Sequence, residues 1–149
     1  MKKFKFRLQK VLEHKLKLFD IAKEEFFLEQ KKLIEQEKKL EEFVAEYRTT
    51  VHNVVQETKN SFRIRDLGVY YKYLFHLKRE MKVQADVVSQ HNAIVAEKRE
   101  RLIEISKEKE VLIKLKEKRR KQYLYTLDFE EQKTIDDLTS AKYSRQYVS

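Results

Sequence analysis

Hydrophobic residues recur every seven positions through the first part of the chain. A second, weaker series begins at Leu8 and mixes apolar with polar residues, among them Lys15, Gln36 and Thr50. A narrow stripe of this period is typical of a helix that packs against one partner helix rather than inside a globular core. We therefore predict a long helix over about residues 3–58. The stripe itself comprises Leu12, Phe19, Phe26, Leu33, Leu40, Tyr47 and Val54.

The second part of the chain repeats the spacing, and we predict a second helix over about residues 67–139. Gln84, His91 and Lys98 interrupt its apolar series. They should weaken the packed interface between the two helices, which we call the seam, and fix its register. Near Lys109 the strict spacing ends, which indicates that the supercoil unwinds or that the partner helix has ended. The sequence does not decide whether residues 140–149 are ordered. The apolar series is Leu74, Met81, Val88, Val95 and Leu102, flanked by Leu77, Ile105 and Leu112.

The two patterns are separated by a break between Asn60 and Gly68. Asp66 is a candidate N-cap for the second helix. With a single Gly and no Pro, the chain supports about one reverse turn, which we predict at about residues 59–66. A short connection favours antiparallel neighbours, in which residue i faces roughly residue 129 − i. The predicted fold class is all-α: one domain, 1–149, formed by a long two-helix antiparallel coiled coil (a helical hairpin) whose C-terminal helix overhangs the first.

Charge is distributed unevenly along this predicted hairpin. The net charge is +9; residues 1–23 hold 8 basic and 2 acidic side chains, and residues 97–121 hold 11 and 6. The hairpin brings these segments together, so one end should be strongly positive. Glutamates are interspersed with the basic run at residues 118–121, so we expect no nucleic-acid partner. The basic, Phe-containing start is too short for a strong membrane anchor.

Catalytic and metal-binding patterns are nearly absent from the sequence. There is no Cys, which excludes thiolate metal sites and Cys nucleophiles. His76 and Glu80 are spaced i, i+4, which favours a surface contact over a metal site. One Gly cannot form a phosphate-binding loop, and the longest uncharged run, residues 87–96, is too short to cross a bilayer. We expect a protein that is not an enzyme and has no catalytic residue, cofactor or metal.

Aromatic residues crowd the start of the predicted second helix, at Tyr70, Tyr71, Tyr73 and Phe75. A two-helix seam cannot bury all of them, so some must point outward. They either contact a protein partner or seal the turn end of the hairpin.

Two segments resemble the FliJ family of flagellar export proteins. The first is residues 4–12, Phe-Lys-Phe-Arg-Leu-Gln-Lys-Val-Leu, and the second is residues 115–123, Leu-Lys-Glu-Lys-Arg-Arg-Lys-Gln-Tyr. Residues 130–133 and 135–138, together with the Tyr- and Leu-rich stretch at 70–77, also fit this family. The resemblance covers nearly the whole chain.

The resemblance implies a helical hairpin similar to the central stalk of rotary ATPases, acting without catalysis in flagellar type III export. It implies three partners: the hexameric flagellar export ATPase, the cytoplasmic domain of the export gate protein, and flagellar export chaperones. The chain is then expected in the cytoplasm, associated peripherally with the cell membrane at the flagellar base through the gate. The implied ATPase-ring residues are Phe4, Phe6, Arg7, Lys10, Lys118, Arg119, Arg120 and Tyr123. The implied gate-binding residues are Gln36, Leu40, Phe43, Tyr47, Tyr73, Leu77 and Gln84.

Two other functions compete with this one. The all-apolar seam and the surplus aromatics also suit a structural coiled-coil protein that self-associates, for example into a four-helix dimer. The equivalent stalk of a virulence type III secretion system is a closer alternative. For Leu40 and Tyr47, which belong to the heptad stripe, seam packing competes with gate binding.

Overall fold

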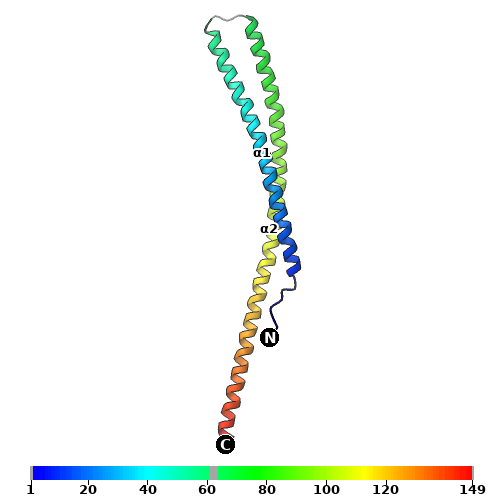
Figure 1. The fold of residues 1–149 in the computed structure, drawn as a ribbon, viewed down its shortest axis with the longest axis vertical. Coiled ribbons are helices and arrows are strands. Elements are labelled where there is room, and N and C mark those ends of the chain that lie inside the picture. The colour runs from blue at the N-terminus through cyan, green and yellow to red at the C-terminus, as the bar shows by residue number, and fades with distance from the viewer. Residues whose placement is uncertain (1, 61–63, 149) are drawn as a thin grey trace. The chain divides into compact units, whose positions relative to one another are not determined.

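The computed structural model describes residues 2–60 and 64–148, and within these ranges it contains two helices and no strand (Figure 1). Helix α1 is Gln9–Thr58 and helix α2 is Ile64–Val148. The two helices pack against each other, which confirms the predicted all-α helical hairpin. The chain divides into two compact units: the terminal unit, Met1–Phe19 with Glu104–Ser149, and the hairpin unit, Asp20–Ile103. The single-domain organisation stays a prediction.

In the hairpin unit, the helices lie antiparallel and side by side (Figure 1). The buried side chains are Ala22, Leu33 and Thr50 from α1 and Leu77 and Val95 from α2. Ala22 and Thr50 belong to the weaker heptad series, so both series of α1 face α2. Thr50 is tolerated there because its hydroxyl donates to the Glu46 carbonyl at 2.8 Å, which satisfies the buried polar group within α1 itself.

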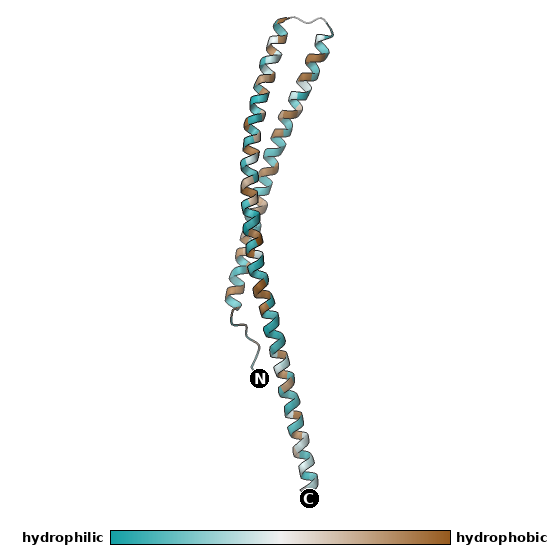
Figure 2. Ribbon diagram, turned by 180° about the vertical axis from the view of Figure 1, so that it is seen from behind, coloured by the Kyte–Doolittle hydropathy of each residue, from teal (hydrophilic) through white to brown (hydrophobic). Residues whose placement is uncertain are grey.

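In the terminal unit, the first turns of α1 pack on α2 through Leu12, which is 4% exposed. Long polar side chains close the seam beyond it. The Lys15 Nζ pairs with the Glu108 Oε2 at 2.6 Å, and the Lys109 Nζ lies 3.9 Å from the centre of the Phe19 ring. Past Leu127, every α2 side chain that the structure describes is exposed, so the predicted overhang of the second helix is confirmed. Figure 2 shows hydrophobic residues recurring along both helices, including this overhang.

The first helix begins at Gln9 rather than near residue 3. Residues 2–8, which we call the N-terminal strap, are not helical and end in a turn where the Gln9 amide donates to the Phe6 carbonyl at 3.1 Å. Exposure alternates along the strap, which is the period of an extended segment with one covered face. The half-buried positions are Phe4, Phe6 and Leu8, and the exposed positions are Lys3, Lys5 and Arg7.

The second helix begins earlier and ends later than predicted. It begins at Ile64, so Asp66 lies in its first turn rather than at the cap, where its carboxylate still favours the positive end of the helix dipole. Of the predicted turn, residues 61–63 lie outside the described residues. Helix α2 continues through residues 140–148 because no Gly or Pro interrupts it there.

The pairing of the two helices follows the predicted register at some contacts and departs from it at others. The Glu57–Tyr70 and Phe19–Lys109 contacts lie within two positions of the predicted partners, about residues 72 and 110. The Gln36 side chain contacts Gln84, whereas the sequence placed Gln36 opposite about residue 93.

Candidate interaction surfaces

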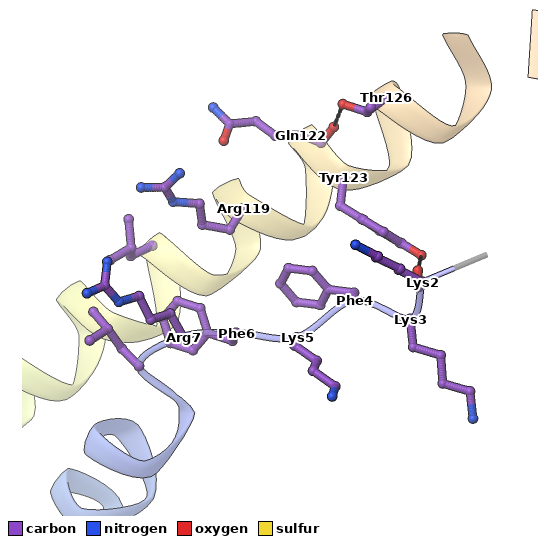
Figure 3. Close-up of a pocket in the computed structure, with 12 residues that line it drawn as sticks. Lys2, Lys3, Phe4, Lys5, Phe6, Arg7, Arg119, Gln122, Tyr123 and Thr126 are labelled. Atoms are coloured by element: carbon purple, nitrogen blue, oxygen red, sulfur yellow. Dashed lines mark hydrogen bonds between the residues drawn. The ribbon is translucent and has the colours of Figure 1, made fainter. Parts of the chain in front are cut away.

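The terminal unit contains an aromatic contact between the N-terminal strap and α2. The Phe4 and Tyr123 ring centroids are 5.6 Å apart with the planes inclined at 42°, a tilted geometry that aromatic pairs favour. The Tyr123 hydroxyl donates a hydrogen bond to the Lys2 carbonyl. Figure 3 shows both rings between the strap and α2, with the Lys3 and Lys5 side chains pointing away from the helix. The strap is therefore attached through its apolar face and presents its basic face to solvent.

The strap and α2 enclose an open hollow of about 1110 Å³ (Figure 3). Five of the eight residues predicted to bind the ATPase ring line it: Phe4, Phe6, Arg7, Arg119 and Tyr123. Lys10 lines a neighbouring hollow of about 630 Å³, formed by the strap, the first turn of α1 and Lys116. Lys118 and Arg120 are exposed on α2 and line neither hollow. The structure thus gathers most of the predicted set at one place.

Sequence reasoning missed three residues of α2 that line the larger hollow, namely Leu115, Gln122 and Thr126. They share a helix face with Arg119 and Tyr123 because residues three, four, seven and eight positions apart lie close together. That spacing was the available signal. It was not used because the first helix was expected to begin near residue 3, and no extended segment along this face was considered.

Several basic side chains at this end of the terminal unit have no ion-pair partner among the described residues. In residues 2–60 and 64–148, no ion pair involves Arg7, Lys118 or Arg119. All three are exposed. Their charge is therefore available to an acidic partner, and its long-range effect will weaken as salt is added.

The predicted gate-binding residues lie in or beside the seam of the hairpin unit. The Gln84 Nε2 donates to both the carbonyl and the side-chain Oε1 of Gln36, each at 2.9 Å. Leu77 is 2% exposed, so α1 already covers it. The Lys78 Nζ lies 5.8 Å from the centre of the half-buried Tyr47 ring. Leu40 and Phe43 are half-buried, and the Tyr73 hydroxyl donates to the Glu46 carboxylate. Gate binding by this set stays a prediction.

The aromatic residues at the start of α2 divide into two groups. Tyr70 and Tyr73 extend toward α1, and the Tyr70 hydroxyl donates to the Glu57 Oε1 at 3.1 Å. This hydrogen bond to a carboxylate raises the pKa of the Tyr70 phenol above its ordinary value. Tyr71 and Phe75 are instead 62% and 65% exposed. Two aromatics thus tie the turn end together while two others face solvent.

The overhang of α2 carries apolar side chains that nothing in the described chain covers. Phe129, Ile135 and Leu138 are all among its exposed hydrophobic residues. Acidic residues predominate between positions 127 and 138, where five acidic side chains accompany one Lys. Near its end, the Tyr143 and Tyr147 rings lie with centroids 5.1 Å apart and planes inclined at 44°. The hydrogen bond between their hydroxyls raises the pKa of Tyr147.

Within the described ranges, no three potential metal-ligating side chains lie together, and neither helix offers a stretch apolar enough to cross a bilayer. What the surfaces offer is charge, aromatic area and exposed apolar side chains, which are suited to protein contacts.

A family model described as the flagellar FliJ protein matches residues 4–147. The comparisons with curated proteins and with solved structures give no match.

Proposed function

This chain belongs to the FliJ family, which makes it a component of the flagellar export apparatus, and we propose that it acts as a non-enzymatic stalk in the ring of the export ATPase. We further propose that it links the ring to the cytoplasmic domain of the export gate protein and escorts export chaperones. It would then work in the cytoplasm, held at the inner face of the cell membrane at the flagellar base by the gate alone.

The terminal unit carries this proposal. It joins three features: unpaired basic side chains, the aromatic strap and an overhanging helix with exposed apolar residues. A ring lumen that offers carboxylates and apolar loops would complement all three. Arg7 and Arg119 would pair with carboxylates, while Phe4 and Tyr123 would supply a rigid aromatic contact.

The proposed mechanism needs no chemistry from this chain. A stalk that binds the assembled ring more tightly than separate ATPase subunits shifts the equilibrium toward the ring by mass action. Because the ring is the active form in this proposal, ATP hydrolysis rises with assembly. The size of the effect is set by the difference in affinity for the two states.

For the gate we propose a contact along the edge of the hairpin-unit seam. Tyr73 is the exposed member of the predicted set, at 38%, and the half-buried Tyr47 also lies at this edge, beneath Lys78. Leu77 is buried against α1, so its part would be to hold the two helices in register beneath that edge rather than to contact the gate itself.

The basic end can be tested by reversing charge at Lys118, Arg119 and Arg120 together, each to Glu. We expect association with the export ATPase to slow by about tenfold at low salt, because exposed charges act mainly on the association rate. Stopped-flow fluorescence at several salt concentrations measures the rate.

The matched control reverses Lys31, Lys38 and Lys39, which are exposed on α1 in the hairpin unit and change the net charge equally. Circular dichroism checks that both variants remain helical. An unchanged association rate for the first variant at low salt, or the same loss in the control, contradicts docking through the basic end.

A further inference from the structure

The outward side of α2 near its start carries a second cluster of basic and aromatic residues. Its members are Tyr71, Lys72, Phe75, Arg79 and Lys82, which we call the outer α2 patch. Spacings of three, four, seven and eight positions place them on one helix face. All five are exposed, and none belongs to the predicted ATPase-binding or gate-binding sets.

Charge is segregated in this patch in a way that is unusual for this chain. No acidic residue occurs between Asp66 and Glu80, whereas Lys and Glu alternate along most of both helices. Glu80 is half-buried, away from the solvent-facing side. In the described part of the chain, Lys72, Arg79 and Lys82 form no ion pair. An ordinary solvated helix face mixes the two signs of charge. This face carries only basic charges from Lys72 to Lys82, and the exposed Asp86 four positions later ends the basic stretch.

Gly68 extends the accessible strip by one turn toward the start of α2. It lies three residues before Tyr71 and four before Lys72, and a Cβ atom added there would meet nothing within 4 Å. The helix backbone is therefore uncovered beside the aromatic residues, so another polypeptide could approach it closely.

We propose that the outer α2 patch docks an acidic segment of a protein partner, one that also carries apolar side chains. Tyr71 and Phe75 supply apolar area, which such a segment can cover. Lys72, Arg79 and Lys82 pair with its carboxylates, and Arg79 can bind one of them in bidentate fashion. This inference does not depend on a role in the ATPase ring.

Charge and length favour a protein segment over nucleic acid or a membrane surface. Lys72 and Lys82 are separated by about 15 Å along the helix at 1.5 Å per residue, and the exposed Asp86 ends the basic strip on the same face. Three cations over this length release few counterions from nucleic acid. Two aromatic side chains are a small apolar face for an interfacial helix. A short acidic segment fits both the extent and the composition of the patch.

The test uses the full chain and a fluorescent synthetic helical peptide with leucine on one face and glutamate beside it. Fluorescence anisotropy measures its dissociation constant. Reversing Lys72, Arg79 and Lys82 to Glu should weaken binding about tenfold, and Tyr71→Ser with Phe75→Ser about fivefold. A scrambled peptide of the same composition should bind the native chain about fivefold more weakly, because it cannot align both faces.

The Lys31, Lys38 and Lys39 reversal serves again as the matched control and should change binding less than twofold. Since every substituted side chain is exposed, the variants should fold, and circular dichroism verifies this. The proposal is overturned by any of three results: no binding of the peptide, equal weakening in the control, or tighter patch-dependent binding of single-stranded DNA or phosphatidylserine vesicles than of the peptide.

Discussion

The hairpin unit and the terminal unit bury their apolar residues in different ways. In the hairpin unit, Leu33, Leu77 and Val95 are buried between the two helices. Among the described residues of the terminal unit, Leu12 is the one hydrophobic residue that is buried, and an extended strap covers α2 beyond it. The α2 overhang of that unit leaves its apolar side chains exposed.

This contrast separates stability from binding. Buried apolar area is what stabilises a helix pair of this composition, so the hairpin unit should hold most of the folding free energy. Exposed apolar and unpaired basic side chains contribute little to folding, yet they are the groups that a partner can cover. The terminal unit should therefore tolerate substitution with little loss of stability and much loss of binding.

The largest effect on stability is expected at the hairpin seam, for Leu77→Ala. Leu77 is 2% exposed, and truncating a buried Leu costs about 2–5 kcal/mol through lost burial and the cavity left behind. Urea unfolding followed by circular dichroism measures the free energy of unfolding. The control is Val83→Ala, at a position 59% exposed, which should cost less than about 0.5 kcal/mol. Equal losses of unfolding free energy for the two variants would contradict the assignment of stability to the buried seam positions.

Phe4→Ala combined with Phe6→Ala should instead weaken binding to the export ATPase while changing the stability of the chain little. Both side chains are half-buried on a non-helical strap, so we expect less than about 1 kcal/mol lost from the free energy of unfolding. Binding to the export ATPase should weaken by about tenfold or more, because aromatic anchors dominate interface energies. Titration calorimetry with the ATPase and urea unfolding give the two numbers. A large loss of stability with intact ATPase binding would assign the strap to folding instead.

A smaller, favourable effect is expected for Gly68→Ala. Gly68 lies inside α2, and the added methyl group meets open space. Replacing a helical Gly by Ala stabilises by about 0.5–1 kcal/mol through the entropy of the unfolded chain. A rise in the thermal midpoint would support a helix that begins at Ile64. A fall would indicate that residue 68 belongs to the turn rather than to the helix.

The smallest effect concerns pH and Tyr70→Phe. The bond to Glu57 raises the pKa of the Tyr70 phenol, so this group adds stability below the ordinary tyrosine pKa of about 10 and loses it as the pH rises through the higher folded value. The variant should therefore show a flatter decline of stability above about pH 10 than the native chain. Urea midpoints across this range measure it, with Tyr71→Phe as control. Identical pH profiles for the native chain and Tyr70→Phe would contradict the Tyr70–Glu57 contact.

Heptad spacing was sufficient to predict the hairpin, because two helices with a shared stripe have few other ways to bury it. Both series of α1 face α2, including the polar members Gln36 and Thr50, since their side chains find partners in the seam or on their own helix. The helix ends were predicted less well. No strong cap marks Ile64, and nothing in the composition of residues 140–148 distinguishes a final helix from a loose end.

The strap was missed although its signal is present in the sequence. Phe4, Phe6 and Leu8 alternate with basic residues, a period of two that indicates an extended segment. The heptad series that begins at Leu8 concealed it, because the series was extended backward as helix. The prediction that the basic-end residues cluster did not depend on this error. Antiparallel pairing places Phe4 close to Tyr123 whether the start of the chain is a strap or a helix. For the gate set, the sequence could not tell seam from surface, and the structure buries Leu77.

The central claim is that the terminal unit promotes assembly of the export ATPase ring. It is tested most directly by titrating this chain into the cognate flagellar export ATPase while ATP hydrolysis and assembly state are recorded together, the latter by mass photometry. The account predicts that hexamers and turnover rise together and saturate near one chain per ring, and that the variant reversed at Lys118, Arg119 and Arg120 is less effective. Unchanged hydrolysis and assembly at saturating concentrations of this chain would contradict the stalk role.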